Sequence, residues 1–310
     1  MLTALEASGM DISYIRQLGP EYSAARTAQY VAVNDAAKNL VVAMADMSIL
    51  TAHTFPTYWS SAVASSKPKW LVVDGNWGPR DLSAWIQTGR ENGSRIVFEP
   101  VSSPKSQGLF PPRERGDPGL GLFPHHSIDL TTPNQYELES MYKAAEENGY
   151  ISRSGIPVDD LSAPPFRDAH LSPERARWIV SLLPFVSTII TKLGSEGAVL
   201  ATLLTPDDPR ARDPDQAQFV ARARYGDTRY GGVYVRHFPA SETVKDVVSV
   251  NGVGDTFLGV LVAGLAQGGR IENLVDVAQR AAVLTLRSHE SVSDELVGLR
   301  GAVRDASLRS

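Results

Sequence analysis

The chain has 310 residues, of which 43% are hydrophobic and 21% are charged, and its formal net charge at pH 7 is −5. These values are typical of a soluble globular protein with one large α/β domain or two smaller ones, and they give no reason to expect nucleic acid or an anionic membrane as a partner. The sequence contains no cysteine, which excludes disulfides and thiolate metal sites.

No pattern in the sequence predicts a membrane anchor or a targeting signal. The apolar run that starts at Trp178 is short, because Pro184 interrupts it and Lys192 ends it. The N-terminal residues lack the basic and then apolar layout of a secretory signal, and the C-terminal residues carry no retention or lipidation signal. We therefore expect a cytoplasmic protein.

The first predicted elements are a short helix and a hairpin. The helix over 2–8 is expected to stop at Gly9, since glycine is typical of a helix C-terminus. β-like runs at 28–33 and 40–47 enclose the polar segment 34–39, which predicts two antiparallel strands joined by a turn.

Beyond the hairpin, predicted strands and helices alternate. Such alternation indicates a parallel sheet with helices on both faces, in which active sites lie at the carboxyl ends of the strands. Two segments, 102–126 and 205–232, are expected to be long surface loops. In chain order, the expected elements are strands at 70–75, 95–99, 128–130, 188–191 and from 198, and helices at 81–90, 134–148, 173–183, 256–266 and 271–288.

The most informative segment is residues 249–259, which read SVNGVGDTFLG. A tight glycine turn leads here into a long apolar helix, so several backbone N–H groups lack helical partners and point the same way. A helix start of this kind attracts an anion. Asp255 stands beside it, where a carboxylate can take a proton from a hydroxyl. Together these features suit the transfer of a phosphoryl group from ATP to an alcohol.

The same residues also have a purely structural interpretation. An acidic residue in the first turn of a helix commonly serves as an N-terminal charge or cap. Because G-x-G-D alone is not a specific motif, the functional interpretation of Asp255 depends on other parts of the sequence.

Four passages, taken in chain order, make the sequence similar to a known family. It resembles the ribokinase-like (PfkB) carbohydrate and nucleoside kinases, and within them the eukaryotic pseudouridine kinases, which are often fused to a pseudouridine-5′-phosphate glycosidase. The resemblance extends over about 9–288. The passages are the hairpin at 30–47, FEPVSSPKS at 98–106, TPNQYEL at 132–138, and KLGSEG at 192–197 followed by the glycine turn.

The resemblance implies a ribokinase-like three-layer α/β/α fold with a mainly parallel central sheet and a small β lid. Residues 1–310 would form a single PfkB-type kinase domain, in which the hairpin at about 28–47 helps to form a lid over the sugar. It also implies that Asp255 is the base that deprotonates the attacking hydroxyl. The N–H groups of Gly252, Val253 and Gly254 would form the anion hole for the transferred phosphoryl group.

The resemblance assigns Asn134 and Glu137 to magnesium. Both carry oxygen donors, which Mg²⁺ prefers, and a water-mediated ion needs few direct protein ligands. Their three-residue spacing places both on one face of the helix that begins there. The alternative is a structural capping box, with Asn134 as the N-cap and Glu137 three residues later.

The resemblance also places the nucleotide near Lys192, Gly194, Gly197 and Asn251. The two glycines would let the backbone approach ATP, and Lys192 would meet a phosphate. The alternatives are a β-turn between two strands for the glycines, and solvation of a strand end for Lys192.

Three departures from the family pattern matter. Ser249 replaces the first acid of the glycine turn, which argues against the monovalent cation site that this acid often supports in the family. Val253 replaces an alanine beside the anion hole, although the backbone N–H is unchanged. The family's N-terminal block, with the first strands of the sheet, an acidic sugar-binding residue and a Gly-Gly-x-x-x-Asn segment, is not found here. We therefore expect an N-terminally truncated domain that lacks part of the sugar clamp.

The resemblance implies an ATP-dependent kinase that uses Mg²⁺ and phosphorylates the 5′-hydroxyl of pseudouridine. Two alternatives stay open at this point: another sugar or nucleoside as the acceptor, and a truncated kinase remnant that binds nucleotide or a partner without turnover. The expected partners are a small-molecule nucleoside or sugar and a pseudouridine-5′-phosphate glycosidase domain or protein, with neither nucleic acid nor membrane involved.

Overall fold

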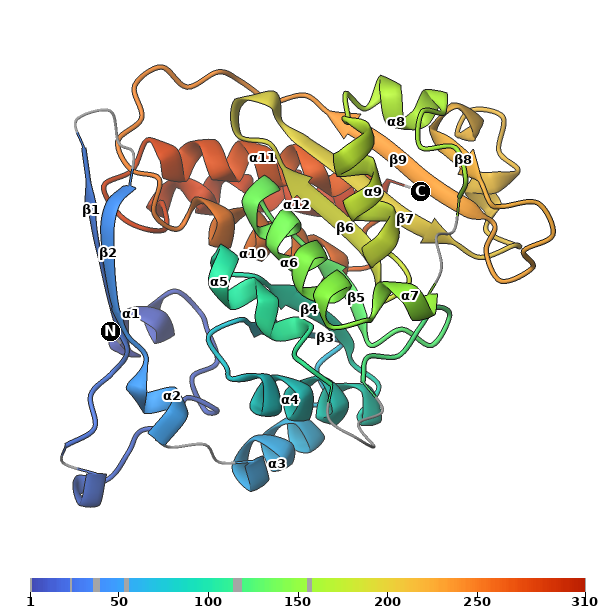
Figure 1. Cartoon of the computed structure of the whole chain (residues 1–310). Helices are drawn as coiled ribbons and strands as arrows, with labels where there is room; N and C mark the ends of the chain where they lie inside the picture. Colours follow the sequence, from blue (N-terminus) through green and yellow to red (C-terminus); the bar gives the residue numbers. More distant parts are fainter. Residues whose placement is uncertain are drawn as a thin grey trace. The chain divides into compact units, whose positions relative to one another are not determined.

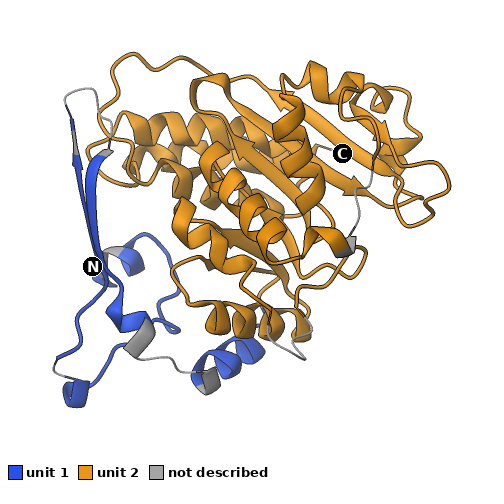
Figure 2. Ribbon diagram, in the orientation of Figure 1, with its two compact units in different colours: residues 1–67 blue, residues 68–310 orange. Residues whose placement is uncertain are grey.

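The structure is a computed structural model that describes residues 2–22, 24–35, 40–52, 56–113, 119–154 and 158–309. The chain divides into two compact units, Met1–Lys67 and Pro68–Ser310, which Figure 2 shows in blue and orange. The single kinase domain expected over residues 1–310 stays a prediction.

The first unit contains an antiparallel hairpin, as the sequence predicts. Strand β1 (Gln29–Asn34) pairs with β2 (Leu40–Asp46) in a register that runs from Gln29 opposite Asp46 to Val33 opposite Val42. Of the predicted turn, residues 36–39 lie outside the described residues. The other elements of this unit are α1 (Leu2–Ala7), η1 (Pro20–Tyr22), α2 (Ser48–Ala52) and α3 (Pro56–Ser66).

The second unit is built on a seven-stranded sheet (Figure 1). Its strands are β3 (Trp70–Asp74), β4 (Arg95–Glu99), β5 (Ile128–Thr131), β6 (Val186–Lys192), β7 (Ala198–Leu204), β8 (Val220–Arg222) and β9 (Gly232–Phe238). They stand in the order β3-β4-β5-β6-β7-β9-β8. The strands from β3 to β6 are parallel, and antiparallel pairs join β7, β9 and β8 to them, so that β9 again runs in the direction of β6.

Helices cover both faces of this sheet. Successive residues of a strand point to opposite faces, so one strand can contribute side chains to the cores on both sides. The helices are α4 (Pro79–Glu91), α5 (Ser103–Ser106), η2 (Gln107–Leu109), α6 (Gln135–Glu147), α7 (Ile151–Ser154), α8 (Pro164–Asp168), α9 (Pro173–Leu182), η3 (Gly194–Glu196), η4 (Pro209–Ala211), η5 (Ala217–Phe219), α10 (Val253–Ala266), α11 (Ile271–Leu286), η6 (Asp294–Leu299) and α12 (Arg300–Leu308). In β4, Ile96 and Phe98 join a core with α4, α6 and α9, whereas Val97 joins a second core with α10, α11 and α12. The predicted three-layer α/β/α architecture is confirmed (Figure 1).

Across the ranges that the structure describes, no helix combines the length and the apolar character needed to cross a membrane.

The segments expected to be long loops contain more structure than the sequence predicts. Segment 205–232 includes β8, and β9 follows it directly, so this stretch supplies the outer end of the sheet. Strand β8 has 3 residues, which is too short for an alternating pattern to be recognised. Segment 102–126 begins with α5 and η2, and its residues 114–118 lie outside the described ranges.

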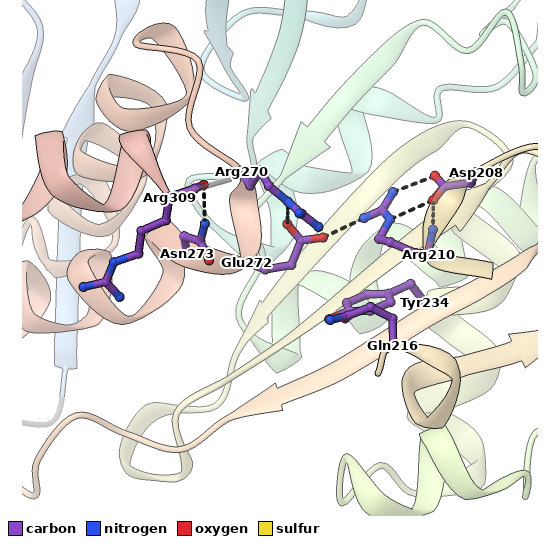
Figure 3. Close-up of polar contacts among 8 residues, drawn as sticks. All are labelled: Asp208, Arg210, Gln216, Tyr234, Arg270, Glu272, Asn273 and Arg309. Atoms are coloured by element: carbon purple, nitrogen blue, oxygen red, sulfur yellow. Dashed lines mark hydrogen bonds and ion pairs between the residues drawn. The ribbon is translucent and has the colours of Figure 1, made fainter. Parts of the chain in front are cut away.

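A group of charged residues ties segment 205–232 to the start of α11 (Figure 3). The guanidinium of Arg210 donates to the two carboxylate oxygens of Asp208 at 3.0 and 2.9 Å and to Glu272 at 2.8 Å, and it lies over the ring of Tyr234. Burial opposes ionisation of Asp208, but the hydrogen bonds and the charge of Arg210 hold the pKa of that carboxyl below its usual value. The bidentate pair with Asp208 holds the guanidinium within the segment, and the pair with Glu272, which has little exposure to water, anchors the segment to α11.

Candidate active site

The glycine turn forms the N-terminus of α10. Gly252 is the N-cap residue, with a left-handed φ of 71°, and no side chain caps the helix. The N–H of Thr256 donates to the carbonyl oxygen of Gly252 at 2.8 Å. Within the described residues, the N–H groups of Val253, Gly254 and Asp255 have no hydrogen-bond partner. These consecutive donors at a helix start are available to an anion.

Contacts with α11 and with the segment that follows it fix the turn in place. The hydroxyl oxygens of Thr256 and Thr285 lie 2.9 Å apart in the interior. A Cβ atom at position 252 would collide with the carbonyl oxygen of Ser291. Both this close approach and the left-handed φ require glycine at position 252.

Asp255 is the third residue of α10, and its side chain is exposed. The structure gives its carboxylate no hydrogen bond or ion pair with any described residue, so Asp255 does not act as a hydrogen-bonding cap. A carboxylate in this state can accept a proton from a hydroxyl that lies against the free N–H groups. That Asp255 is the base stays a prediction.

Lys192 brings a cation to the glycine turn. It is the last residue of β6, and its N–H donates to the carbonyl oxygen of Pro133 at 2.8 Å. Its Nζ lies 3.0 Å from the position that a Cβ atom would take on Gly254. The ammonium group therefore lies beside the free N–H groups, and the role of Lys192 in binding a phosphate stays a prediction.

A buried carboxylate that the sequence analysis does not single out lies next to Lys192. Glu99 ends β4, is 7% exposed, and places Oε1 4.0 Å from Lys192 Nζ. The hydroxyl of Thr132 donates to its Oε2 at 3.1 Å. Burial raises the pKa of Glu99, the charge of Lys192 opposes this rise, and the carboxylates of Glu137 and Asp255 add to it. These carboxylates repel one another, so a cation that enters between them would be stabilised.

The predicted magnesium pair forms a capping box at the start of α6. Asn134 Oδ1 accepts the N–H groups of Tyr136 at 2.9 Å and Glu137 at 3.0 Å. In return, Glu137 Oε2 accepts the N–H of Asn134 at 2.8 Å. The structural alternative for this pair is therefore present in the fold, and it uses most of the oxygen atoms that a metal ion would need.

The oxygen atoms that the capping box leaves free decide how Asn134 and Glu137 could hold Mg²⁺. Glu137 is 5% exposed, and its Oε1 has no hydrogen-bond partner among the described residues. In the same ranges, no group of three or more His, Asp or Glu side chains is placed to hold a metal ion directly. The residues thus fit an ion that is bound through water molecules, with the carboxylates of Glu137 and Glu99 supplying negative charge.

We expect the change Glu137→Gln to raise the Mg²⁺ concentration that gives half-maximal activity by about 3- to 10-fold, because it removes one charge near the ion. Glutamine can still accept the Asn134 N–H, so the capping box and the helix should persist. The measurement is a Mg²⁺ titration of the phosphotransfer rate. The matched control is Glu139→Gln two residues later, where the native side chain pairs with Lys143 at the surface. Identical Mg²⁺ titrations for both variants would contradict a metal role for Glu137.

A pocket of about 390 Å³ opens beside Lys192 and Gly254. We call it the β6–α11 pocket, because residues from the end of β6, segment 239–250, α10 and α11 line it. Its walls are largely apolar and include Val244, Val247, Val250, Phe257, Val283 and Leu286. A volume and a lining of this kind suit a flat aromatic base.

The structure brings most of the predicted nucleotide-binding residues to this pocket. Lys192, Gly194 and Gly197 line it, but Asn251 does not. Gly194 has open space where a side chain would stand, as close approach by a ligand requires, whereas a Cβ atom on Gly197 would collide with Phe238. The glycine at 197 is therefore needed for packing as well.

The residue that replaces the family's first acid takes part in the turn itself. The hydroxyl of Ser249 accepts the N–H of Asn251 at 3.1 Å. This hydrogen bond joins two residues of the turn without a carboxylate at position 249.

Comparison with sequence families and related proteins agrees with this geometry. The model of the pfkB family of carbohydrate kinases matches residues 1–296. A pseudouridine-metabolizing bifunctional protein of Schizosaccharomyces pombe is 27% identical over 282 residues, which are 86% of this chain and 34% of that protein. A pseudouridine kinase of Arabidopsis thaliana is 25% identical over 248 residues, which are 74% of this chain and 60% of that protein. The chain thus spans less than two thirds of either relative.

Solved structures share the fold. A putative sugar kinase from Clostridium perfringens superposes with a TM-score of 0.54 at 17% identity, and the match covers 91% of this chain and 69% of that one. At this identity the similarity concerns the fold alone, and it agrees with the three-layer arrangement around the mainly parallel sheet.

Proposed function

Because this chain belongs to the pfkB family of carbohydrate kinases, we propose that it transfers the terminal phosphoryl group of ATP to a hydroxyl of a sugar or nucleoside. The observation that carries the proposal is the start of α10, where the free N–H groups of residues 253–255 lie beside the unpartnered carboxylate of Asp255. Both elements of phosphoryl transfer, an anion hole and a base, therefore occur within one helical turn.

In the proposed reaction, the Asp255 carboxylate takes the proton of the acceptor hydroxyl as its oxygen forms a bond to the terminal phosphorus. The bond from that phosphorus to the bridging oxygen breaks, and ADP leaves with the electron pair. The N–H groups of Gly254 and its neighbours, with the ammonium of Lys192, stabilise the charge on the transferred group. When bound, Mg²⁺ neutralises charge on the nucleotide phosphates, and Asn134 and Glu137 would hold it through water.

The adenine and ribose of the nucleotide are assigned to the β6–α11 pocket. Lys192 and Gly254 line the pocket at the glycine turn, and apolar residues of α10, α11 and segment 239–250 form the rest of its walls. A nucleotide in this position would direct its phosphates toward the free N–H groups and its base toward the apolar residues.

The proposed acceptor is pseudouridine, which would be converted to pseudouridine 5′-phosphate. The proposal is supported by the names of the two relatives, both of which refer to pseudouridine, although their identities to this chain are only 27% and 25%. The fission yeast relative is named as a bifunctional protein. We therefore also propose that a pseudouridine-5′-phosphate glycosidase, on the same or another chain, acts on the pseudouridine 5′-phosphate that this chain would form.

Turnover by the purified chain tests the proposed function. The chain would be mixed with MgATP and with pseudouridine, uridine, adenosine or ribose, and ADP release and the mass of the phosphorylated product would be followed. We expect the highest kcat/KM with pseudouridine. A clear preference for another acceptor would overturn the proposed substrate. Nucleotide binding without turnover on any acceptor would instead favour the kinase remnant.

A further inference from the structure

A second pocket, of about 440 Å³, opens at the amino ends of the parallel strands. We call it the amino-end pocket, because Trp70 and Arg95, the first residues of β3 and β4, line it together with Arg270 at the start of α11. Lys192, by contrast, ends its strand. Helix α10 begins at the glycine turn and has 14 residues, and Leu265 near its other end lines the amino-end pocket. At 1.5 Å per residue the pocket therefore lies about 20 Å from the proposed phosphate site.

The sheet supplies hydroxyl groups to this pocket. Thr188 of β6 and Thr202 of β7 are paired opposite each other, and both line the pocket. Thr202 is 8% exposed, and its hydroxyl has no hydrogen-bond partner among the residues that the structure describes. A buried hydroxyl without a partner destabilises a protein, and a ligand that supplies the partner removes that cost.

Cationic groups stand at the rim of the same pocket. The guanidinium of Arg95 lies 5.3 Å from the centre of the Trp70 ring and forms no ion pair with a described carboxylate. Nε of Arg270 is 3.8 Å from Glu272, which leaves its terminal nitrogens available. At the start of the 16-residue helix α11, the N–H groups of Ile271 and Glu272 have no acceptor within the described ranges. These donors suit an anionic group.

The carboxylates that line the pocket are already held by protein groups. Asp208 and Glu272 both accept hydrogen bonds from Arg210 (Figure 3). Asp129 accepts Arg90 at 3.0 Å. The remaining carboxylate, at position 213, accepts the backbone N–H of residue 215 at 2.9 Å. Their remaining oxygen lone pairs can accept hydrogen bonds from hydroxyl groups, whereas they would repel a bare anion.

We propose that the amino-end pocket binds a small phosphorylated sugar. The phosphate would lie against Arg95, Arg270 and the start of α11, and the sugar hydroxyls would contact Thr188, Thr202 and the carboxylate oxygens. A pentose phosphate combines one anionic group with several hydroxyls, as this lining requires, and the volume lies in the range of small-molecule sites. The site is separate from the glycine turn, so the inference does not rest on the proposed function.

Calorimetry with ribose 5-phosphate tests the inference without turnover. Ribose and inorganic phosphate would be titrated in parallel, and we expect ribose 5-phosphate to bind about 10-fold or more tightly than either, because one molecule makes both sets of contacts. The titration would be repeated with ADP and pseudouridine present to occupy the proposed catalytic site, and the affinity for ribose 5-phosphate should persist.

Two variants locate the binding site. Thr202→Val removes the hydroxyl with little change of shape, so it should weaken ribose 5-phosphate binding by about 3- to 10-fold while the melting temperature of the ligand-free chain stays the same or rises. Arg95→Gln should weaken binding by about 10-fold or more. The matched controls are Thr191→Val, which removes a buried unpartnered hydroxyl from the other face of the sheet, and Arg304→Gln on the surface of α12. Both controls should bind as wild type does.

The pairing of affinity with stability is decisive, since a merely structural role of Thr202 would change the melting temperature and not the affinity. Wild-type affinity in both Thr202→Val and Arg95→Gln would overturn the site, as would the absence of ribose 5-phosphate binding to wild type or its loss when ADP and pseudouridine are present. Equal affinity for inorganic phosphate and ribose 5-phosphate would overturn the assignment to a sugar.

Discussion

The change Asp255→Asn is expected to lower kcat by about 10²- to 10⁴-fold, the usual contribution of a positioned general base. Asparagine has nearly the same shape as aspartate but cannot take the proton of the acceptor hydroxyl. Since the native carboxylate is exposed and has no hydrogen bond or ion pair among the described residues, its loss should leave the fold intact. The only structural cost would be the interaction of the charge with the helix dipole, about 0.3–1 kcal/mol.

The measurement is kcat with pseudouridine beside the dissociation constant of ADP. We expect the dissociation constant of ADP to change by less than about threefold, because Asp255 contacts the hydroxyl of the sugar or nucleoside acceptor and not the nucleotide. The matched control is Asp246→Asn, an exposed aspartate of segment 239–250 that does not line the β6–α11 pocket. Full activity of Asp255→Asn would remove Asp255 from the role of base. An equal loss of activity in Asp246→Asn would show that removal of any nearby negative charge, and not loss of a general base, lowers the activity.

Much of this site could be predicted because its chemistry depends on local sequence. The glycine turn and Asp255 lie within a few residues of one another, and a helix start fixes where their N–H groups point. The spacing of Asn134 and Glu137 likewise predicts one helical turn. Here the sequence supports two interpretations at once, and the structure contains the capping box without excluding an ion bound through water.

Other features depend on contacts between distant residues and could not be predicted in this way. Glu99 is the last residue of the buried strand β4 and lies in the FEPVSSPKS passage, but that passage does not show which charges face its side chain. The pKa of Glu99 is raised by burial and by carboxylates from other elements. The ion pair of Arg210 with Glu272 joins residues 62 apart in the sequence. Because the sequence alone does not show this partner, segment 205–232 was predicted to be a charged loop. Strand β9 is not among the strands predicted from the sequence, although the run from Val233 to Val235 has the β-branched and aromatic residues that are typical of a strand.

The second large effect is expected for Gly252→Ala, which should destabilise the fold and weaken the binding of ADP. Any side chain at position 252 must adopt a left-handed φ near 71°, and its Cβ would meet the carbonyl oxygen of Ser291. The left-handed φ costs about 1–3 kcal/mol. Relief of the collision requires the turn or the segment at Ser291 to move by roughly an ångström or more. A displaced turn would no longer aim its N–H groups at one phosphate position, and loss of one such donor lowers kcat by about 10²- to 10³-fold.

A matched variant separates these two causes. Gly268 also has a left-handed φ, of 91°, but open space surrounds the position of its missing side chain. Gly268→Ala should therefore lower the free energy of unfolding in urea through backbone strain alone and leave kcat and ADP affinity near their wild-type values. Gly252→Ala should lose more stability than Gly268→Ala and, in addition, lose activity. If both variants kept wild-type activity, the backbone of the glycine turn could not be the group that holds the phosphate, because a collision there would have had no effect on catalysis.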